Sequence, residues 1–400
     1  METVMRSVRL LALVVLVVAT GFTAYADDET KPANGSETFL TVRIIDEDGK
    51  PVADAQAGFK YVENFGNPSK FLPGLKSDKD GLVKFAGEEC EKAVPQMGIY
   101  ARHADRHLVA VHDTAEASAE NMLTLEMVPE CDVSYRLSCS QMSGSKHIWG
   151  SDVAQMMGWG FTSGNKNLAQ GTALPEALIH VYLPPGKYGM YTYGNYLINA
   201  KLPVEIQPGQ RELNLGTIDH PATNLGLLIG QPAPELHDVI EWKNGPAPKF
   251  AELRGKVVLL EFWGWWCGVC IYRGIPEMFK LQEEYQGRDL VIIGVHIDTE
   301  ANEVCTVEKL DEKLVSARKN AWNGKDISFP VALVPAKRTP LGSGIEQTSR
   351  TKSCAEFGIK FCPTSVLIGR DGKVVGMFLP SEESHRAKLK RMLDETSAVP

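Results

Sequence analysis

Two cysteines, Cys267 and Cys270, are separated by only two residues and could do chemistry as a pair. This spacing lets the two sulfurs face each other across one helical turn and close a small disulfide ring. Thiol–disulfide exchange starts from a thiolate, so it requires surroundings that favour negative charge on one sulfur. The pattern therefore predicts a redox-active dithiol.

The residues on either side of the dithiol indicate the elements that hold it. Residues 257–263 (VVLLEFW) form an apolar run with β-branched and aromatic side chains, which is typical of a strand buried on both faces. Residues 271–285 (IYRGIPEMFKLQEEY) carry apolar side chains at helical spacing. We expect Cys267 where this strand runs into the helix N-terminus, because backbone N–H groups and the helix dipole stabilise a thiolate there.

Length, composition and charge narrow the function classes. A chain of 400 residues is too long for one ordinary core and predicts two or three domains. Its composition, 44% hydrophobic and 23% charged, is typical of a globular protein. A net charge of −8 without any basic cluster argues against nucleic-acid binding.

The first 26 residues are predicted to be a signal peptide. Two arginines precede an unbroken apolar run over residues 10–18, and Ala24-Tyr25-Ala26 matches a cleavage site. Cleavage after Ala26 would place the mature chain in the periplasm or outside the cell, which are oxidising compartments. An uncleaved membrane anchor is the alternative, although the run is shorter than the about 20 residues that a span needs.

The middle of the chain is predicted to consist of β-strands. Residues 27–36 are polar and expected to be disordered. Residues 37–129 are predicted to form a β-sandwich, because residues 38–45 alternate between apolar and polar side chains and Asp-Gly turns follow at residues 46–49 and 77–81. Residues 42–55 resemble the opening of the carboxypeptidase regulatory-like β-sandwich family. A second, less regular sandwich-like unit is expected over residues 130–219, where residues 183–188 (LPPGKY) are similar to the last strands of that family.

Neither β unit carries a clear chemical pattern. His103, His107 and His112 could hold a metal, but their spacing on a hairpin need not bring them together and no carboxylate pattern supports them. We therefore predict no metal site. We interpret the β units as a spacer that holds the dithiol away from a membrane or cell wall, with a protein- or glycan-contacting module as the alternative.

Several cysteines outside the dithiol could form structural disulfides, which are the default in an exported protein. A local bridge between Cys131 and Cys139 would leave Cys90 without a partner. Cys305 and Cys354 flank a long segment that a disulfide would clamp. The pairing itself is not determined by the sequence.

The last part of the chain, residues 228–397, is predicted to be an α/β domain that follows a linker over residues 220–227. Its hydrophobic pattern indicates strand–helix–strand around the dithiol, then further strands, a hairpin and a terminal helix. The additional elements are expected at residues 289–298, 307–320, 327–334, 357–378 and 382–393, of which residues 307–320 have helical spacing.

Four motifs of this domain resemble the thioredoxin superfamily, specifically the exported bacterial TlpA-type thiol–disulfide oxidoreductases, which are similar to the alkyl hydroperoxide reductase/thiol-specific antioxidant group. The motifs are I-G-x-P-A-P at 229–234, L-x-G-K-V-V-L-L-x-F-W at 253–263, W-C-G-x-C at 266–270 and P-T-x-x-x-I-x-x-D-G-K at 363–373. The resemblance implies a multidomain chain, with β-sandwich modules followed by a C-terminal α/β thioredoxin fold, and a reaction without a cofactor.

The resemblance also implies a role for each matching residue. Cys267 would be the exposed nucleophile that attacks a substrate disulfide, and Cys270 would resolve the mixed disulfide. Glu261 matches the family's buried carboxylate, which suits proton exchange with Cys270. Pro363 matches the family's cis-proline, which would place the backbone of Cys362 beside the dithiol, where a bound peptide pairs as an added strand. Other residues expected to shape the site are Trp263, Trp266, Gly268, Val269, Cys362 and Thr364.

Three positions depart from the family's pattern. Val269 replaces the usual proline between the cysteines, which leaves the direction of electron flow open. Pro276 lies six residues after Cys270 instead of five, so the helix is expected to kink one residue late or to carry an extra residue in its turn. Cys362 is a third thiol, interpreted as a small buried residue, with exchange with Cys267 or metal binding as the alternative.

These observations lead us to expect an exported oxidoreductase that exchanges disulfides with envelope proteins and receives electrons from an envelope donor. Proximity to a membrane or cell wall is compatible with that role. One alternative is a thioredoxin-fold peroxidase, although the peroxiredoxin pattern P-x-x-x-T-x-x-C is absent before Cys267. The other is a non-enzymatic envelope binding protein in which the cysteine pair is structural.

Overall fold

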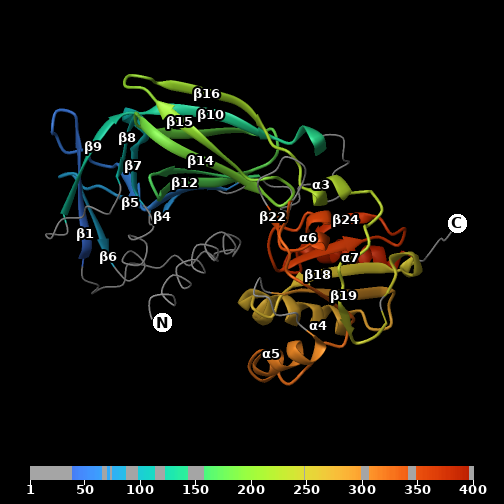
Figure 1. The fold of residues 1–400 in the computed structure, drawn as a ribbon. Helices are drawn as coiled ribbons and strands as arrows, with labels where there is room; N and C mark the ends of the chain where they lie inside the picture. Colours follow the sequence, from blue (N-terminus) through green and yellow to red (C-terminus); the bar gives the residue numbers. More distant parts are fainter. Residues whose placement is uncertain are drawn as a thin grey trace.

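The computed structural model describes residues 38–64, 70–72, 74–86, 98–112, 122–142, 157–246, 248–298, 306–340 and 348–395. The predicted signal peptide, the stretch expected to be disordered, Cys90 and Cys305 all lie outside these residues. Figure 1 shows a strand-rich N-terminal region beside a C-terminal region in which helices pack around a sheet. This layout confirms the predicted fold class.

Within the described residues, the first β unit has nine strands, and seven of them form a sheet with the order β5-β2-β7-β8-β9-β1-β6. Leu40, Val42 and Ile44 alternate with more exposed residues along β1, so one face of this strand is buried. The predicted turn after β1 forms, since the Gly49 N–H donates to the Asp46 carbonyl over 2.8 Å. The strands are β1 (Thr38–Asp46), β2 (Gln56–Gly58), β3 (Lys60–Asn64), β4 (Lys70–Leu72), β5 (Leu75–Lys76), β6 (Leu82–Ala86), β7 (Ile99–His103), β8 (Leu108–His112) and β9 (Met122–Pro129).

The second β unit is joined to the first through a shared sheet. Strand β12 pairs with β3, with Ala169 opposite Tyr61, so a six-stranded sheet β15-β14-β11-β12-β3-β4 crosses the expected boundary at residue 129. A three-stranded sheet β13-β10-β16 packs with it around a common core. The strands are β10 (Cys131–Ser138), β11 (Met157–Ser163), β12 (Lys166–Ala173), β13 (Leu178–Leu183), β14 (Gly186–Gly194), β15 (Ala200–Ile206) and β16 (Glu212–Asp219).

The structure contradicts a local disulfide between Cys131 and Cys139. Both are buried free thiols within the described part of the chain. Cys131 begins β10 and Cys139 follows its last residue, so the extended strand holds their Cα atoms roughly 26 Å apart at about 3.3 Å per residue. A disulfide requires Cα atoms less than about 7 Å apart.

The stretch expected as a linker, residues 220–227, is not an exposed connection. It contains most of helix α3 (Asn224–Leu228), for which Thr223 is the N-cap and accepts from the Gly226 N–H. Leu225 is fully buried in the core of the α/β domain. The two halves of the chain are therefore connected by packed structure.

The α/β domain is built on a six-stranded sheet with the order β17-β20-β19-β18-β23-β24. All seven residues of β18 are buried, which confirms the predicted strand buried on both faces. Strands β18, β19 and β20 run parallel, and β23 pairs antiparallel with β18. The strands are β17 (Glu241–Lys243), β18 (Val257–Trp263), β19 (Leu290–Ile297), β20 (Val331–Val334), β23 (Thr364–Ile368) and β24 (Val374–Phe378). Separately, β21 (Thr339–Pro340) pairs antiparallel with β22 (Thr348–Ser349).

Helices cover this sheet and include the predicted terminal helix. They are a π-helix (Cys270–Gly274), α4 (Ile275–Glu284), α5 (Val307–Asn320), α6 (Lys352–Glu356) and α7 (Glu383–Asp394). Within the described ranges, none of the helices combines the length and apolarity that a membrane crossing requires.

Candidate active site

The dithiol lies at the predicted junction between strand and helix. Cys267 follows the end of β18, and the helical turns begin at residue 268. Cys267 and Cys270 form a disulfide with their Cα atoms 5.2 Å apart. Cys267 is 9% exposed and Cys270 is fully buried. Cys267 is thus the more accessible sulfur, although far less exposed than we expected for a nucleophile.

The backbone around the dithiol is arranged to stabilise a thiolate. The Cys270 N–H donates to Cys267 Sγ over 3.2 Å. The carbonyl of Cys267 accepts from the Ile271 N–H, so the sulfur-bearing residue belongs to the first helical turn. Negative charge on Cys267 Sγ would therefore be stabilised by a backbone donor and by the positive end of the helix.

The extra residue before Pro276 is accommodated by a π-helical turn. The Ile275 N–H donates to the Cys270 carbonyl five residues earlier, which is the π-helical pattern. Pro276 has no N–H, so the next carbonyl, that of Ile271, has no helical donor. The indole N–H of Trp322 bonds to it instead, over 2.8 Å. Of the two expected outcomes, the structure shows the extra residue in the turn.

The segment before Pro363 lies against the dithiol. The Cys362–Pro363 peptide bond is cis, as the resemblance implied. The Cys362 carbonyl oxygen is 3.6 Å from Cys267 Sγ. Thr364 follows the proline, is opposite Phe262 in the sheet, and donates its hydroxyl to the Phe361 carbonyl over 2.8 Å. The end of β23 therefore holds this segment beside the end of β18.

Glu261 is a buried carboxyl beneath the dithiol helix. It is 1% exposed, and its burial raises its pKa from 4.5 to about 7. The hydroxyl of Ser365, its partner across the sheet, donates to Glu261 Oε2. A Cβ atom at Gly274 would lie 2.9 Å from Glu261 Oε1 and 3.2 Å from Pro363 Cβ. Only glycine lets the helix approach both groups this closely.

Ser365 and Gly274 were missed by sequence reasoning. No sequence signal singled out Ser365, because the antiparallel register that places it opposite Glu261 is a feature of the folded sheet. Gly274 gave no signal either, since a glycine inside a helical pattern has many explanations.

The tryptophans around the dithiol are positioned by β19. Trp263 is fully buried, and its ring packs edge-on against His296 with centroids 5.0 Å apart. The backbone N–H of Trp265 donates to His296 Nε2 over 3.4 Å, and the indole N–H of Trp266 donates to the Ile297 carbonyl over 2.9 Å. Burial lowers the pKa of His296 to about 3, so the ring stays a neutral acceptor. His296 was also missed by sequence reasoning.

The other predicted site residues differ in accessibility. Gly268 is exposed with open space beside it, and Val269 is partly buried against the core. Cys362 is a partly buried free thiol, and desolvation raises its pKa well above the usual value. The thiol therefore stays protonated near neutral pH, which disfavours a role as a second nucleophile.

The three histidines considered for a metal do not converge. His103 is paired with Leu108 and His112 with Ile99, so they occupy opposite ends of the β7–β8 hairpin. His107 Nδ1 instead contacts Glu130 at 3.1 Å. In the described part of the chain no group of three or more His, Cys, Asp or Glu side chains could hold a metal ion.

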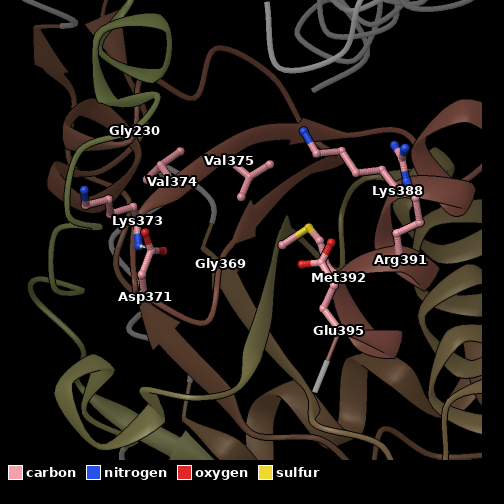
Figure 2. Close-up of a pocket in the computed structure, with 10 residues that line it drawn as sticks. All are labelled: Gly230, Gly369, Asp371, Lys373, Val374, Val375, Lys388, Arg391, Met392 and Glu395. Carbon is pink, nitrogen blue, oxygen red and sulfur yellow. Dashed lines mark hydrogen bonds between the residues drawn. The ribbon is translucent and has the colours of Figure 1, made fainter. Parts of the chain in front are cut away.

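A pocket of about 450 Å³ lies between the β23–β24 hairpin and α7. Figure 2 shows Lys373 and Asp371 on its hairpin side and Lys388 and Arg391 on its helix side. It adjoins the end of β23 marked by Gly369, whereas the dithiol adjoins the opposite end at Thr364. The pocket is therefore separate from the dithiol site.

Comparisons with known proteins match mainly the α/β domain. Residues 229–393 match the Redoxin family model. The chain is 31% identical over 147 residues to thiol-disulfide oxidoreductase ResA of Bacillus cereus, a match that covers 37% of this chain and 67% of ResA. It is 26% identical over 237 residues to Protein SUPPRESSOR OF QUENCHING 1, chloroplastic, of Arabidopsis thaliana, covering 58% of this chain and 20% of that protein.

Solved structures give similar coverage. The thioredoxin-like superfamily protein SPOA0173 is 25% identical, with 42% of this chain and 98% of that chain covered and a TM-score of 0.32. A putative thiol:disulfide interchange protein DsbE from Chlorobium tepidum is 24% identical, with 41% and 94% covered and a TM-score of 0.28. The matched ResA region is two thirds of that protein, and the matched Arabidopsis region is one fifth.

Proposed function

This chain belongs to the thioredoxin superfamily, as a TlpA-type protein with a Redoxin domain, and from this premise we propose that Cys267 and Cys270 exchange disulfides with protein substrates. The single observation that carries the proposal is the approach of the Cys362 carbonyl, next to the cis proline, to Cys267 Sγ at 3.6 Å. An extended peptide that pairs with this backbone would have its own cysteine beside Cys267.

In the reducing direction, the reaction starts from the dithiol form. The Cys267 thiolate attacks one sulfur of the substrate disulfide, the substrate S–S bond breaks, and the other substrate sulfur leaves as a thiolate that takes up a proton. Cys270 then loses its proton and attacks Cys267 Sγ, which releases the second substrate thiol. Two electrons have passed to the substrate, and the enzyme has the Cys267–Cys270 disulfide seen in the structure.

Glu261 is suited to receive the proton of Cys270. A carboxyl with a pKa of about 7 is partly ionised at neutral pH and can both take up and return a proton. Its position under the dithiol helix, next to Gly274, is shielded from solvent. We assign it the role of general base in the resolving step and general acid in the reverse reaction.

The cellular setting of the proposal rests on the sequence. The predicted signal peptide would deliver the chain to the periplasm or the exterior, where substrates would be envelope proteins with disulfides or dithiols. A regenerating electron donor in the same compartment completes the cycle, because each reduced substrate leaves the enzyme oxidised.

Reduction of insulin by the mature chain, with dithiothreitol as electron source, tests the proposal. We expect Cys267→Ser to abolish the activity and Cys270→Ser to accumulate mixed disulfides that resist resolution. A double Cys267→Ser/Cys270→Ser variant that remains as active as the wild type would disprove the assignment.

A further inference from the structure

A lysine close to the cis proline is bonded entirely to the second β unit. Lys360 Nζ donates to the carbonyls of Gly194 (2.7 Å) and Leu197 (2.8 Å) and to Asn199 Oδ1 (2.9 Å). Three acceptors match the three donors of an ammonium group. Gly194 ends β14, and Leu197 and Asn199 lie in the loop that connects β14 to β15, at the side where the β region meets the α/β domain (Figure 1).

The same loop is anchored in the α/β domain by Tyr196. This side chain is 2% exposed and packs into a core cluster with Phe262 and Val366 of the central sheet. Its hydroxyl accepts the Met377 N–H of edge strand β24 over 2.9 Å, and its carbonyl accepts the Thr223 N–H over 2.7 Å. The loop therefore has a fixed position relative to the sheet that carries the dithiol.

The interaction is costly for the lysine, which argues that its geometry matters. Desolvation lowers the pKa of Lys360 to about 8. Lys360 is only partly buried, and the three hydrogen bonds offset its desolvation while the ammonium stays in place. The contact thus favours one position of the ammonium group, which ties the Lys360 segment to the second β unit.

Lys360 is two residues from Cys362, whose carbonyl lies next to Cys267 Sγ. The intervening Phe361 is held by the Thr364 hydroxyl, so the segment has little freedom to absorb a shift of Lys360. We propose that the contact between Lys360 and residues 194–199 positions the Cys362–Pro363 backbone and thereby sets its distance from the dithiol. The β region then positions the backbone that binds the polypeptide and is not merely a spacer.

This inference rests on the proposed function, and it separates two kinds of substrate. A polypeptide disulfide uses the Cys362 backbone for strand-like pairing, whereas a small disulfide such as 5,5′-dithiobis(2-nitrobenzoate) needs only access to Cys267. Displacing a positioned binding element lowers the rate only for the substrate that uses it.

The test measures both reactions with pre-reduced protein in single-turnover stopped flow. For Lys360→Met we expect the second-order rate constant with insulin to fall by about tenfold or more, and the rate constant with the small disulfide to stay within about twofold. Lys360→Arg keeps the charge and several donors and should recover part of the insulin rate. Asn199→Ala, which removes one acceptor, should lower the rate constant with insulin to a smaller extent. It provides the test if Lys360→Met does not fold.

Lys243→Met is the matched control. Lys243 is more deeply buried than Lys360 and bonds Asp311 over 2.9 Å, but it lies on β17 at the opposite edge of the sheet from β24. It should lose stability without changing the ratio of the two rate constants. The inference is overturned if Lys360→Met and Asn199→Ala leave that ratio unchanged, or if Lys243→Met changes it equally. A wild type that reduces neither substrate would instead refute the proposed function.

Discussion

The indole N–H of Trp322 donates to the carbonyl oxygen of Ile271, the residue after the buried cysteine of the dithiol, over 2.8 Å. Trp322 lies 51 residues further along the chain, beyond α5. Its hydrogen bond occupies the position that the missing N–H of Pro276 would have filled in the π-helical ladder. The helix that presents the dithiol is therefore completed by a side chain outside it.

Replacing Trp322 by Phe should lower the free energy of unfolding by about 1–3 kcal/mol, because the buried carbonyl of Ile271 loses its donor. A phenyl ring retains edge-on packing against Phe279, whose centroid is 5.6 Å away. Urea titration measures the change. Trp242→Phe makes the same chemical change at a partly buried position, for which the described residues include no indole hydrogen bond. Equal losses in the two variants would rule out the role given to the hydrogen bond.

Glu261 should make stability depend on pH. Because burial raises its pKa from 4.5 to about 7, the folded state keeps a proton that the unfolded state releases between these values. The retained proton therefore contributes about 3 kcal/mol to the free energy of unfolding. This contribution is complete below about pH 4.5 and is lost as the pH rises through about 7. Denaturant titrations measure the free energy of unfolding at pH 5 and at pH 8. The difference between the two values should be smaller for Glu261→Gln than for the wild type. Identical pH profiles would show that the carboxyl titrates normally.

The same carboxyl should control the resolving step. In Glu261→Gln, we expect release of substrate from a preformed mixed disulfide at Cys267 to slow by about 100-fold, because the proton of Cys270 has no general base. The wild-type rate should rise with pH through an inflection near 7 that the variant lacks. Quenched samples separated on non-reducing gels follow this step. An unchanged inflection would assign it to another group.

Ser365 should adjust that inflection. Its hydroxyl donates to Glu261 and lowers the pKa of this carboxyl against the larger effect of burial. Ser365→Ala should therefore move the inflection of the resolving rate to higher pH, whereas Ser365→Thr, which keeps a hydroxyl, should remain close to the wild type. A shift to lower pH in Ser365→Ala would contradict this assignment.

Gly274 should tolerate no side chain. A methyl group there would lie 2.9 Å from Glu261 Oε1 and 3.2 Å from Pro363 Cβ, so Gly274→Ala should cost about 1–3 kcal/mol of stability and slow insulin reduction. Gly268→Ala is the comparison, since a Cβ atom there meets no atom within 4 Å. Its stability should stay equal or rise slightly, given the better helix propensity of alanine. Thermal unfolding of both variants provides the measurement.

Local patterns in the sequence were sufficient for the dithiol and the elements beside it. The apolar run of β18, the spacing of Cys267 and Cys270, and the helical pattern after them all act over a few residues, so each could be recognised without tertiary information. The displaced Pro276 indicated an irregular helix, either with a late kink or with an extra residue in its turn. The structure has the extra residue, and the Ile271 carbonyl that this turn leaves without a helical donor accepts from the Trp322 indole.

Contacts between distant residues were decided by the tertiary structure alone. Glu261 and Ser365 are 104 residues apart, and Lys360 is 166 residues from Gly194, so neither contact leaves a periodic signal in the chain. The same holds for β3, which pairs with β12 across the expected boundary between the β units. Sequence determined which residues could do chemistry, whereas burial and long-range pairing determined the protonation, orientation and neighbours with which they do it.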